Sequence, residues 1–380
     1  MEAAFERMAR ALARRRSALG SSAEAFALRI ADREPVTFGE GDPSFTVVVN
    51  DRRGIAALTS LDVTAAGEAY LAGSIDLDGD VQKLLALRSL FKNRHPLRYA
   101  YRFVRPLVFG QVASDHQWIA AHYDEDPAFF QLFLDTRHRA YSQGIHLSAD
   151  EPLEDAITRK LDFAWDSANI QPGQRVLDIG AGWGAFTEYA GKKGAHVTSL
   201  TISKESEAFV NALIEREGLP CQVRREHFFE HAPAEPYDAI VNLGVTEHLP
   251  DYPGTLARYH ALLKPGGRVY LDASAARAKH KTSDFFERYI YPGNGSQLCL
   301  HEYLEALAVT PMEVEQVVND RVNYGLTTRA WARNLDAHRE EIEQRWGKAH
   351  YRKFQLYLWG CVDGFERDLL QAYRLVLYRP

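Results

Sequence analysis

An acid and an imidazole stand side by side at positions 247 and 248, inside the stretch "NLGVTEHLPDY" (residues 242–252). The stretch begins where the apolar run "YDAIV" ends, so Glu247 and His248 follow the end of an expected buried strand. A carboxylate and an imidazole that share a pocket can accept a proton from a reacting group. A polar surface turn has the same residue types, so the pair predicts an acid–base site only together with other motifs.

A glycine-rich loop follows another apolar strand in "VLDIGAGWGAF" (residues 176–186). Asp178 precedes the turn, and Gly180, Gly182 and Gly184 let the backbone bend sharply and approach a ligand closely. The loop lacks the final spacing of the dinucleotide motif, and the next strand end, "LTIS", has no acid to hold a nicotinamide ribose. We therefore expect a nucleotide-type ligand other than NAD.

Alternating segments place both motifs at strand ends. From residue 151 onward the strand-like runs "RVLDIGA", "HVTSLTI", "CQVRR", "YDAIVNLG" and "GRVYLDA" alternate with helical runs. This alternation predicts an α/β fold, a Rossmann-like parallel sheet with helices on both faces. Ligands of such sheets bind beyond the carboxyl ends of the strands, where the loop and the acid–imidazole pair are expected to meet.

Three segments are expected along the chain. Residues 1–90 contain a basic helix, strand patterns and a helix–turn–helix pattern broken at Gly73 and Gly79, which together predict a small α+β domain. Residues 91–150 form a linker with covering helices. Residues 151–380 form the catalytic domain.

The linker begins with an unusual mixture of basic and aromatic residues, "FKNRHPLRYAYRFVRPLVFG". Arginines such as Arg98, Arg102 and Arg105 interleaved with aromatic rings suit the boundary between lipid headgroups and acyl chains. A linker helix whose arginines lie over the surface of a domain explains the same pattern. Both interpretations stay open from the residues alone.

Composition limits the class of partner. The 380 residues carry a formal net charge of −6, which argues against a general nucleic-acid binder. Cys221, Cys299 and Cys361 are far apart without metal-ligand or disulfide spacing, so we expect no metal and a reducing, cytoplasmic setting. No stretch approaches the roughly 18 apolar residues of a membrane span. The expected location is therefore cytoplasmic, peripheral on the inner membrane face.

Taken in order, the motifs resemble those of the cyclopropane fatty acid synthase family of S-adenosylmethionine-dependent lipid methyltransferases, whose relatives include mycolic acid methyltransferases. Besides the glycine loop, "LTIS" and "GVTEHLPDY", the similar segments are "GEAYLAGSIDLDGD", "AYSQGIHL", "LLKPGGRVYLD", "FFERYIYPGN" and "NYGLTTRAW". The resemblance spans nearly the whole chain. It implies the sheet of a class I S-adenosylmethionine methyltransferase.

The resemblance also implies residues that bind the methyl donor. Some would contact its amino-acid end, Thr201 and Ser203 would lie near its ribose, and an acid near its adenine falls on or beside Glu226. The complete expected set is Tyr141, Ser142, Asp178, Gly180, Gly182, Trp183, Thr201, Ser203, Glu226 and His227.

In the family, the residues that match Glu247 and Tyr324 help to hold a bicarbonate ion that acts as the base. This chain departs from the family pattern at two of the surrounding positions, where Gln143 replaces a cysteine and Asp272 a histidine. A second carboxylate near Glu247 disfavours an anion and raises the pKa of one carboxyl. We hypothesise that bicarbonate is weakly bound or absent and that Glu247 or Asp272 is the base. The candidate catalytic residues are Glu247, His248, Asp272, Tyr324 and Gln143.

The expected reaction transfers a methyl or methylene group to the double bond of an unsaturated fatty acyl chain of a phospholipid. Phe285, Tyr289 and Tyr291 in "FFERYIYPGN" could stabilise the carbocation that forms, although packing of a helix core explains them equally. A methyltransferase for a small amine or natural-product carbon, and a non-catalytic lipid-binding protein, remain alternatives. Ring-closed and branched products, and a homodimer, are left open.

Overall fold

The computed structural model describes residues 2–18, 25–30, 33–91, 126–280, 283–291 and 295–380. Of the basic–aromatic stretch, only Phe91 belongs to the described residues. The rest of the stretch, including Arg98, Arg102 and Arg105, lies outside them. The chain divides into two compact units. The first contains Met1–Tyr99, Ser283–Ile290 and Leu335–Asp363, and the second contains Ala100–Thr282, Tyr291–Asn334 and Gly364–Pro380.

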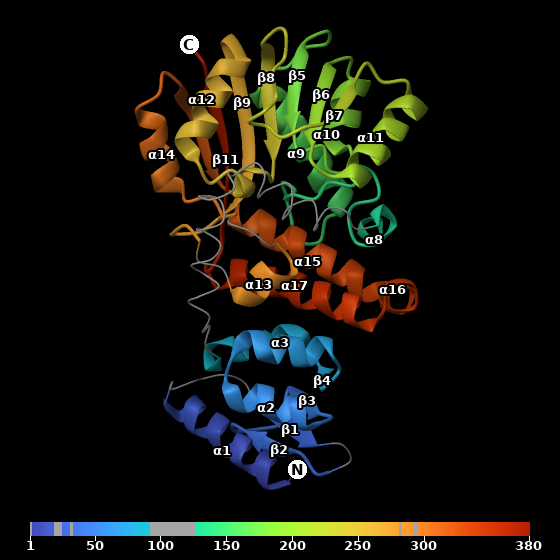
Figure 1. The fold of residues 1–380 in the computed structure, drawn as a ribbon, viewed down its shortest axis with the longest axis vertical. Coiled ribbons are helices and arrows are strands. Elements are labelled where there is room, and N and C mark those ends of the chain that lie inside the picture. The colour runs from blue at the N-terminus through green and yellow to red at the C-terminus, as the bar shows by residue number, and fades with distance from the viewer. Residues whose placement is uncertain (1, 19–24, 31–32, 92–125, 281–282, 292–294) are drawn as a thin grey trace. The chain divides into compact units, whose positions relative to one another are not determined.

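The second unit is built on a seven-stranded sheet with the strand order β10-β11-β9-β8-β5-β6-β7 (Figure 1). The strands β5 to β9 run parallel, while β11 pairs antiparallel with both β9 and β10. The bounds are β5 Arg175–Ile179, β6 His196–Thr201, β7 Gln222–Arg225, β8 Tyr237–Leu243, β9 Leu263–Ala275, β10 Glu313–Asn319 and β11 Gln371–Tyr378. All five strand-like runs of the sequence form strands, and the predicted α/β fold class is confirmed.

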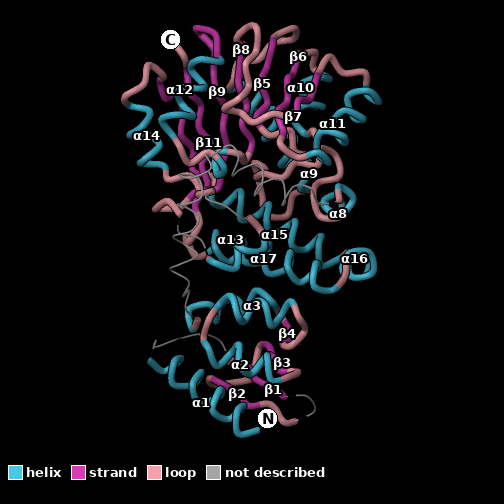
Figure 2. Tube along the Cα trace, in the orientation of Figure 1, coloured by secondary structure: helices cyan, strands magenta, loops and turns pink. Residues whose placement is uncertain are grey.

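Helices cover this sheet because side chains alternate between its two faces. Every second residue of β9 from Val269 to Ala275 packs into an apolar core with α12 and α14. On the opposite face, Tyr270 contacts Phe163 of α9 with ring centroids 6.0 Å apart. Figure 2 shows the alternation of helices and strands in this unit. Its helices are α8 Pro127–Gln131, α9 Leu153–Ser167, α10 Ala185–Lys192, α11 Lys204–Glu217, α12 Tyr252–Leu262, α14 Leu300–Ala308 and most of α15 Arg321–Ala337.

The first unit contains a four-stranded sheet of order β2-β1-β3-β4 with an apolar core that includes one face of helix α1. Its strands are β1 Phe26–Ile30, β2 Val36–Phe38, β3 Phe45–Val49 and β4 Ile75–Gly79. The neighbouring helices are α1 Glu2–Ala18, α2 Arg52–Ser60, α3 Val63–Leu71, α4 Val81–Leu85 and the 3-10 turn Ala86–Leu90. This is the expected small α+β domain.

One local prediction in this domain was wrong. The segment between Gly73 and Gly79 was expected to be a turn between helices, but it contains strand β4, which pairs antiparallel with β3. The sequence "IDLDG" alternates apolar and acidic residues with the period of a half-buried strand. That pattern outweighs the helical pattern on either side of it.

Three later helical segments complete the first unit: α13 Asp284–Tyr289, α16 Arg339–Trp346 and most of α17 Lys348–Glu366. A buried polar network ties α17 to the N-terminal domain, since Tyr70 Oη donates to Gln355 Oε1 at 2.7 Å. The guanidinium of Arg352 also donates to the Tyr70 carbonyl and pairs with the Asp76 carboxylate. Segments distant in sequence therefore share one folded unit.

In the described part of the chain, no helix has both the length and the apolar character that crossing a bilayer requires.

Candidate active site

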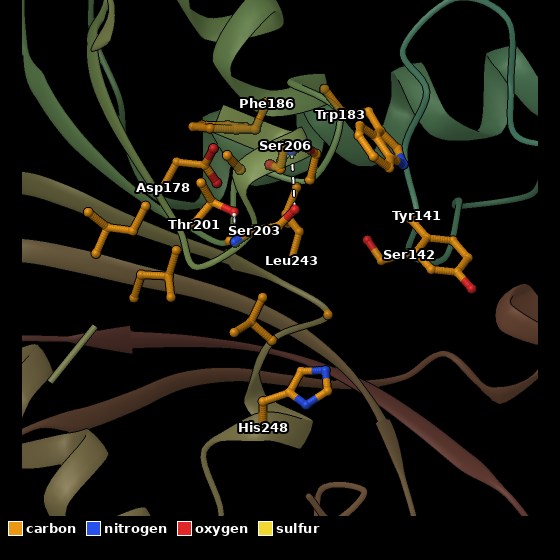
Figure 3. Close-up of a pocket in the computed structure, with 18 of the residues that line it drawn as sticks. Tyr141, Ser142, Asp178, Trp183, Phe186, Thr201, Ser203, Ser206, Leu243 and His248 are labelled. Atoms are coloured by element: carbon orange, nitrogen blue, oxygen red, sulfur yellow. Dashed lines mark hydrogen bonds between the residues drawn. The ribbon is translucent and has the colours of Figure 1, made fainter. Parts of the chain in front are cut away.

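A cavity of about 1110 Å³, including its open mouth, lies at the carboxyl ends of β5, β6 and β8 (Figure 3). This is where a parallel sheet is expected to bind its ligand. Every residue that was expected to bind the methyl donor lines this one cavity. They are Tyr141, Ser142, Asp178, Gly180, Gly182, Trp183, Thr201, Ser203, Glu226 and His227.

The glycine loop forms one wall of the cavity because its backbone adopts a conformation that favours glycine. Gly180 has φ +87°, its N–H donates to Leu200 O at 3.0 Å, and a Cβ there would lie 2.3 Å from Val245 Cγ2. Gly182 has φ +50°, and a Cβ at this residue would meet only the Gly180 carbonyl oxygen, 4.0 Å away. A ligand can therefore approach the backbone closely at Gly182, while Gly180 lets β5 and the β8 loop pack together.

Hydroxyl groups fix the turn after β6. The Ser203 amide donates to Thr201 Oγ1 at 3.2 Å, and the Ser206 amide donates to Ser203 Oγ at 3.2 Å, which caps helix α11 (Figure 3). Ser206 Oγ also donates to Gly182 O at 2.7 Å. Ser206 therefore joins the β6 turn to the glycine loop.

Two acids on the lining are held by buried partners. Glu226 Oε1 lies 2.6 Å from His231 Nδ1, and His231 Nε2 lies 2.9 Å from Tyr237 Oη. The Asp178 carboxylate accepts from Ser199 Oγ at 2.9 Å, and burial raises its pKa to about 7. Each carboxylate is thus oriented by the protein before any ligand binds.

This lining fits S-adenosylmethionine. The open glycine backbone at Gly182 admits a close ligand, and the hydroxyls of Thr201 and Ser203 with Glu226 suit a ribose and a base. Apolar side chains between them, including Leu200 and Phe228, suit the flat adenine ring. The Ser142 hydroxyl faces the cavity from the opposite segment (Figure 3), where the amino-acid end is expected.

Glu247 lies in the 3-10 turn Thr246–His248 after β8, between Val245 and His248, which both line the cavity. Its Oε1 accepts from the Ser274 amide at 2.7 Å and from Ser274 Oγ at 2.8 Å. Its Oε2 is buried and accepts no hydrogen bond from the described residues. Burial, together with the charge of Asp272, raises the pKa of Glu247 to about 7. The arrangement leaves one oxygen of a basic carboxylate available.

Asp272 lies on β9 two residues before Ser274, hence on the same face of the strand. It is fully buried, and burial raises the pKa of its carboxyl to about 6 although Lys160 opposes the shift. Lys160 Nζ on α9 lies 3.8 Å from Asp272 Oδ2 and donates to Ser142 Oγ at 2.7 Å. The hypothesis of two neighbouring carboxylates therefore has a geometric basis, but a cation accompanies them.

The remaining catalytic candidates occupy different places. His248 lines the cavity, burial lowers its pKa to about 4, and its ring lies 5.5 Å from that of Tyr291. Gln143 is buried beside Ser142, and its side-chain amide has no hydrogen-bond partner among the described residues. Tyr324 is half-buried and stacks on Phe365 at 4.8 Å, away from the cavity lining.

The aromatic substrate candidates are divided between the two units. Tyr291 lies in the second unit beside His248. Phe285 and Tyr289 belong to helix α13 of the first unit, where Phe285 packs on Gly67 and Tyr289 Oη donates to Glu68 at 2.9 Å. Within that unit both rings serve the packing of α13 on α3. Their role toward substrate stays a prediction.

Two residues of the site were missed from the sequence, Lys160 and Ser274. Lys160 stands in the buried stripe of α9, which also contains Ala156, Ile157, Leu161 and Ala164. A lysine inside an apolar helical stripe is rarely buried without a partner, and this was the available signal. Ser274 follows Asp272 with strand spacing, but only the pairing of β8 with β9 brings it to Glu247.

Comparison with known proteins decides the family. The family model described as mycolic acid cyclopropane synthetase matches residues 111–375, more than half of the chain. The chain belongs to this family. A domain of unknown function matches residues 20–97, within the N-terminal domain. Membership in the mycolic acid cyclopropane synthetase family confirms the predicted resemblance, the class of S-adenosylmethionine-dependent methyltransferases and the methyl donor.

Individual relatives agree with this family. A sphingolipid C9-methyltransferase of Candida albicans is 25% identical over 81% of this chain and 64% of its own length. A probable fatty acid methyltransferase of Pseudomonas putida is 25% identical over 89% and 88%. A mycolic acid cyclopropane synthase solved with SAH and CTAB has a TM-score of 0.63 and 25% identity over 68% of this chain and 96% of its own. The chain spans about six tenths of the sphingolipid C9-methyltransferases it matches.

Proposed function

We propose that the protein is an S-adenosylmethionine-dependent C-methyltransferase acting on the double bond of an unsaturated fatty acyl chain of a lipid. The observation that carries this proposal is the Glu247 carboxylate, which has one anchored oxygen and one without a hydrogen bond from the described residues, in a turn whose residues Val245 and His248 line the donor cavity. Transfer of carbon to an alkene produces a cation that must lose a proton at a defined place. A basic carboxylate beside a methyl donor supplies that acceptor.

S-adenosylmethionine, when bound, supplies a methyl group attached to a positively charged sulfur. A carbon–sulfur bond breaks, a carbon–carbon bond forms, and the positive charge passes to the acceptor carbon. The protein contributes by aligning the alkene and by keeping water away from this cation. The glycine loop and the residues on the opposite wall, including Tyr141 and Ser142, hold the donor end of this alignment.

Glu247 then accepts the proton at Oε2, while Ser274 holds Oε1 in place. A carboxyl with a pKa of about 7 is ionised for a large fraction of the time at neutral pH and is far more basic than an exposed glutamate. The proton that leaves decides the product. Loss from the new methyl group closes a cyclopropane, whereas loss after a hydride shift leaves a methylene branch.

Bicarbonate fits these residues poorly. Asp272, which stands where the family pattern has a histidine, offers carboxylate oxygens that accept hydrogen bonds and repel an anion. The negative charge of Asp272 already raises the pKa of Glu247, and an additional anion would raise it further. We therefore assign the base to the chain itself. Adding bicarbonate to dialysed enzyme is expected to change the rate by less than about twofold, and a large activation would contradict the assignment.

A lipid acceptor is supported by the relatives, whose names specify sphingolipid and fatty acid substrates. We propose a phospholipid-borne acyl chain presented at a membrane surface, with the protein bound peripherally and the first unit facing lipid. The basic–aromatic stretch that suggested this surface lies outside the described residues. A homodimer is compatible with this arrangement.

The test is incubation of the whole protein with methyl-labelled S-adenosylmethionine and vesicles of a defined unsaturated phospholipid, followed by mass spectrometry of the acyl chains. Parallel reactions contain unsaturated ceramide, free unsaturated fatty acid or small secondary amines. A mass gain of one CH₂ on the acyl chain is expected, and fragmentation locates a ring or a branch. Label in an amine but in no lipid would establish the amine methyltransferase alternative instead. Absence of label everywhere with intact donor binding would contradict an enzymatic role.

A further inference from the structure

Lys160 is a buried cation in the wall of the donor cavity. Its side chain is 1% exposed, although it sits on helix α9 among alanine, isoleucine and leucine side chains. A buried ammonium is costly unless carboxylates and hydrogen-bond acceptors compensate it. Its Nζ donates to Ser142 Oγ at 2.7 Å and lies 3.8 Å from Asp272 Oδ2. These two contacts belong to different parts of the site.

The first contact concerns the donor. Ser142 is 2% exposed and lines the cavity, where its hydroxyl faces the expected amino-acid end of S-adenosylmethionine (Figure 3). Because Lys160 donates to its oxygen, the Ser142 hydroxyl proton points away from Lys160, and its interaction with the Asp272 carboxyl favours the ionised form of that group. Lys160 also lines the cavity, so its positive charge acts on the carboxylate of a bound donor.

The second contact concerns the base. Asp272 stands two residues before Ser274, which anchors the Glu247 carboxylate, and the charge of Asp272 adds to the effect of burial in raising the pKa of Glu247. Arg374 of β11, the other cation near Asp272, is paired with Asp320 at 3.3 Å. Lys160 is therefore the nearest cation to Asp272 among the described residues. Asp135, after helix α8, and Asp178 of β5 also face Lys160 and favour its charged form against the lowering of its pKa by burial.

We propose that Lys160 is a positioning residue that couples donor binding to proton removal, by placing a positive charge in the wall of the donor cavity and by keeping Asp272 ionised on the strand that anchors Glu247. The inference rests on the proposed function for its catalytic consequence. The inference adds Lys160, which was not among the expected site residues, and assigns to its ammonium the compensation of the Asp272 charge.

The positive charge of Lys160 determines how readily Asp272 and Glu247 lose their protons. With Lys160 present, Asp272 stays an anion, and its negative charge helps to keep Glu247 basic. Both carboxyls can still lose their protons near neutral pH, because their pKa values are about 6 and about 7. Without the ammonium, the buried Asp272 and Glu247 pair retains one proton to higher pH, because two unscreened carboxylates cannot both ionise readily. Glu247 is then the ionised acceptor in a smaller fraction of molecules.

A direct test measures the protonation of the carboxyl pair without any reaction. Wild type, Lys160→Met and Lys160→Arg are compared by infrared spectroscopy at about pH 8, where the carbonyl stretch of a protonated buried carboxyl separates from carboxylate bands. We expect this band in Lys160→Met and its absence in wild type and Lys160→Arg. Adding Asp272→Asn to Lys160→Met removes the band, because Glu247 then ionises without a neighbouring charge.

The activity test uses the pH dependence of kcat on unsaturated phospholipid. In Lys160→Met the acid limb moves to higher pH by about one unit, so the rate at pH 7 falls about fivefold. The dissociation constant of S-adenosylhomocysteine rises in the same variant because the cavity wall loses a positive charge that attracts the carboxylate of the ligand. Lys160→Arg restores the acid limb. Lys192→Met, which removes an exposed ammonium of α10 from Glu188 and Glu217, leaves both quantities unchanged.

The outcomes separate the two proposals. A carboxyl band in Lys160→Met, with a wild type that methylates no lipid, supports the charge role and rejects the lipid reaction. Normal lipid methylation in wild type, with identical infrared spectra and pH profiles in Lys160→Met, overturns the inference. Lys160→Gln supplies a second neutral side chain if thermal unfolding shows that the methionine variant does not fold.

Discussion

At the scale of single residues, the site depends on how a few buried carboxylates are compensated. Ser274 occupies only one oxygen of Glu247, and Lys160 Nζ stays 3.8 Å from Asp272 Oδ2. Such incomplete compensation raises the pKa of a buried acid instead of stabilising its ion. A carboxylate that is costly to ionise is also a good proton acceptor, and this is the physical basis of the proposed role of Glu247.

Replacing Glu247 with glutamine removes the proton acceptor while the volume and the contact with Ser274 stay nearly the same. We expect kcat to fall by about 10²- to 10⁴-fold, the usual contribution of a general base. The dissociation constant of S-adenosylhomocysteine, measured by calorimetry, should stay within about twofold because Glu247 does not line the donor cavity. Glu305→Gln on α14 is the matched control, since Glu305 is exposed. Retention of kcat in Glu247→Gln would reject this residue as the base.

The rate of the wild-type enzyme should depend on pH through the same group. Glu247 must be ionised to accept a proton, and its pKa is raised to about 7 by burial and by Asp272. The rate is therefore low below pH 6, rises through pH 7 and levels off above about pH 8. An acid limb near the ordinary pKa of glutamate, about 4.3, would mean that Glu247 is exposed to water during turnover. The profile is measured with donor and lipid both saturating.

At the scale of elements, strand ends and the turns that follow them hold the site together. The β5 loop, the β6 turn and the β8 turn meet because Gly180 packs directly on Val245 and Ser206 bonds to Gly182. The strand pairing then brings the β8 turn to β9, where the Gly244 amide donates to Asp272 O at 3.0 Å. A displacement of one of these turns therefore shifts both the lining of the donor cavity and the proposed base Glu247.

Gly180→Ala tests this contact between turns. The new Cβ would lie 2.3 Å from Val245 Cγ2, so the loop or the β8 turn must move. We expect donor affinity to fall at least about tenfold, or 1.4 kcal/mol. Gly173→Ala is the matched control because its φ is +84° but nothing lies within 4 Å of the new Cβ. That control should lose roughly 1–2 kcal/mol of unfolding free energy from backbone strain and keep normal donor affinity. Equal donor affinity in both variants would contradict the role of the contact.

At the scale of the whole molecule, the chain is organised into units that do not follow its order. Helix α13 and the C-terminal helices α16 and α17 fold with the N-terminal domain, although the catalytic sheet lies between them in sequence. Within the first unit, Arg352 and Gln355 of α17 bond to Tyr70, and Arg288 of α13 pairs with Glu68. The N-terminal domain is thus stabilised by segments inserted in and appended to the methyltransferase fold.

Gly67→Ala should destabilise this composite unit. A Cβ at Gly67 in α3 would lie 2.5 Å from Phe285 Cδ2 of α13, and such overpacking costs about 1–3 kcal/mol. Gly360→Ala in α17 is the matched control, because its Cβ meets nothing within 4 Å and helix propensity favours alanine by up to about 1 kcal/mol. Chemical denaturation followed by circular dichroism compares the two. If Gly67→Ala proves as stable as the control, α13 does not contribute to the stability of this unit.

Much of this organisation could be predicted from local patterns. The short apolar runs "YDAIV" and "GRVYLDA", the glycine spacing around Gly180 and the position of Glu247 after a strand are properties of neighbouring residues. Local sterics and burial determine them, so they predict the sheet, the loop and the cavity at the strand ends. The strand β4 was missed because two competing periodicities overlap there.

The partners of the buried Asp272 and Glu247 carboxylates could be found only from the tertiary structure. Lys160 meets Asp272 only because α9 packs on one face of β9, and Ser274 reaches Glu247 only in the observed register, which pairs Leu243 with Asp272. A slip of one residue would turn Asp272 to the opposite face of the sheet. Sequence spacing along one strand carries no information about that register. The sequence by itself therefore determined which groups stand at the strand ends, while the packing of α9, β8 and β9 decided which of these groups lie together.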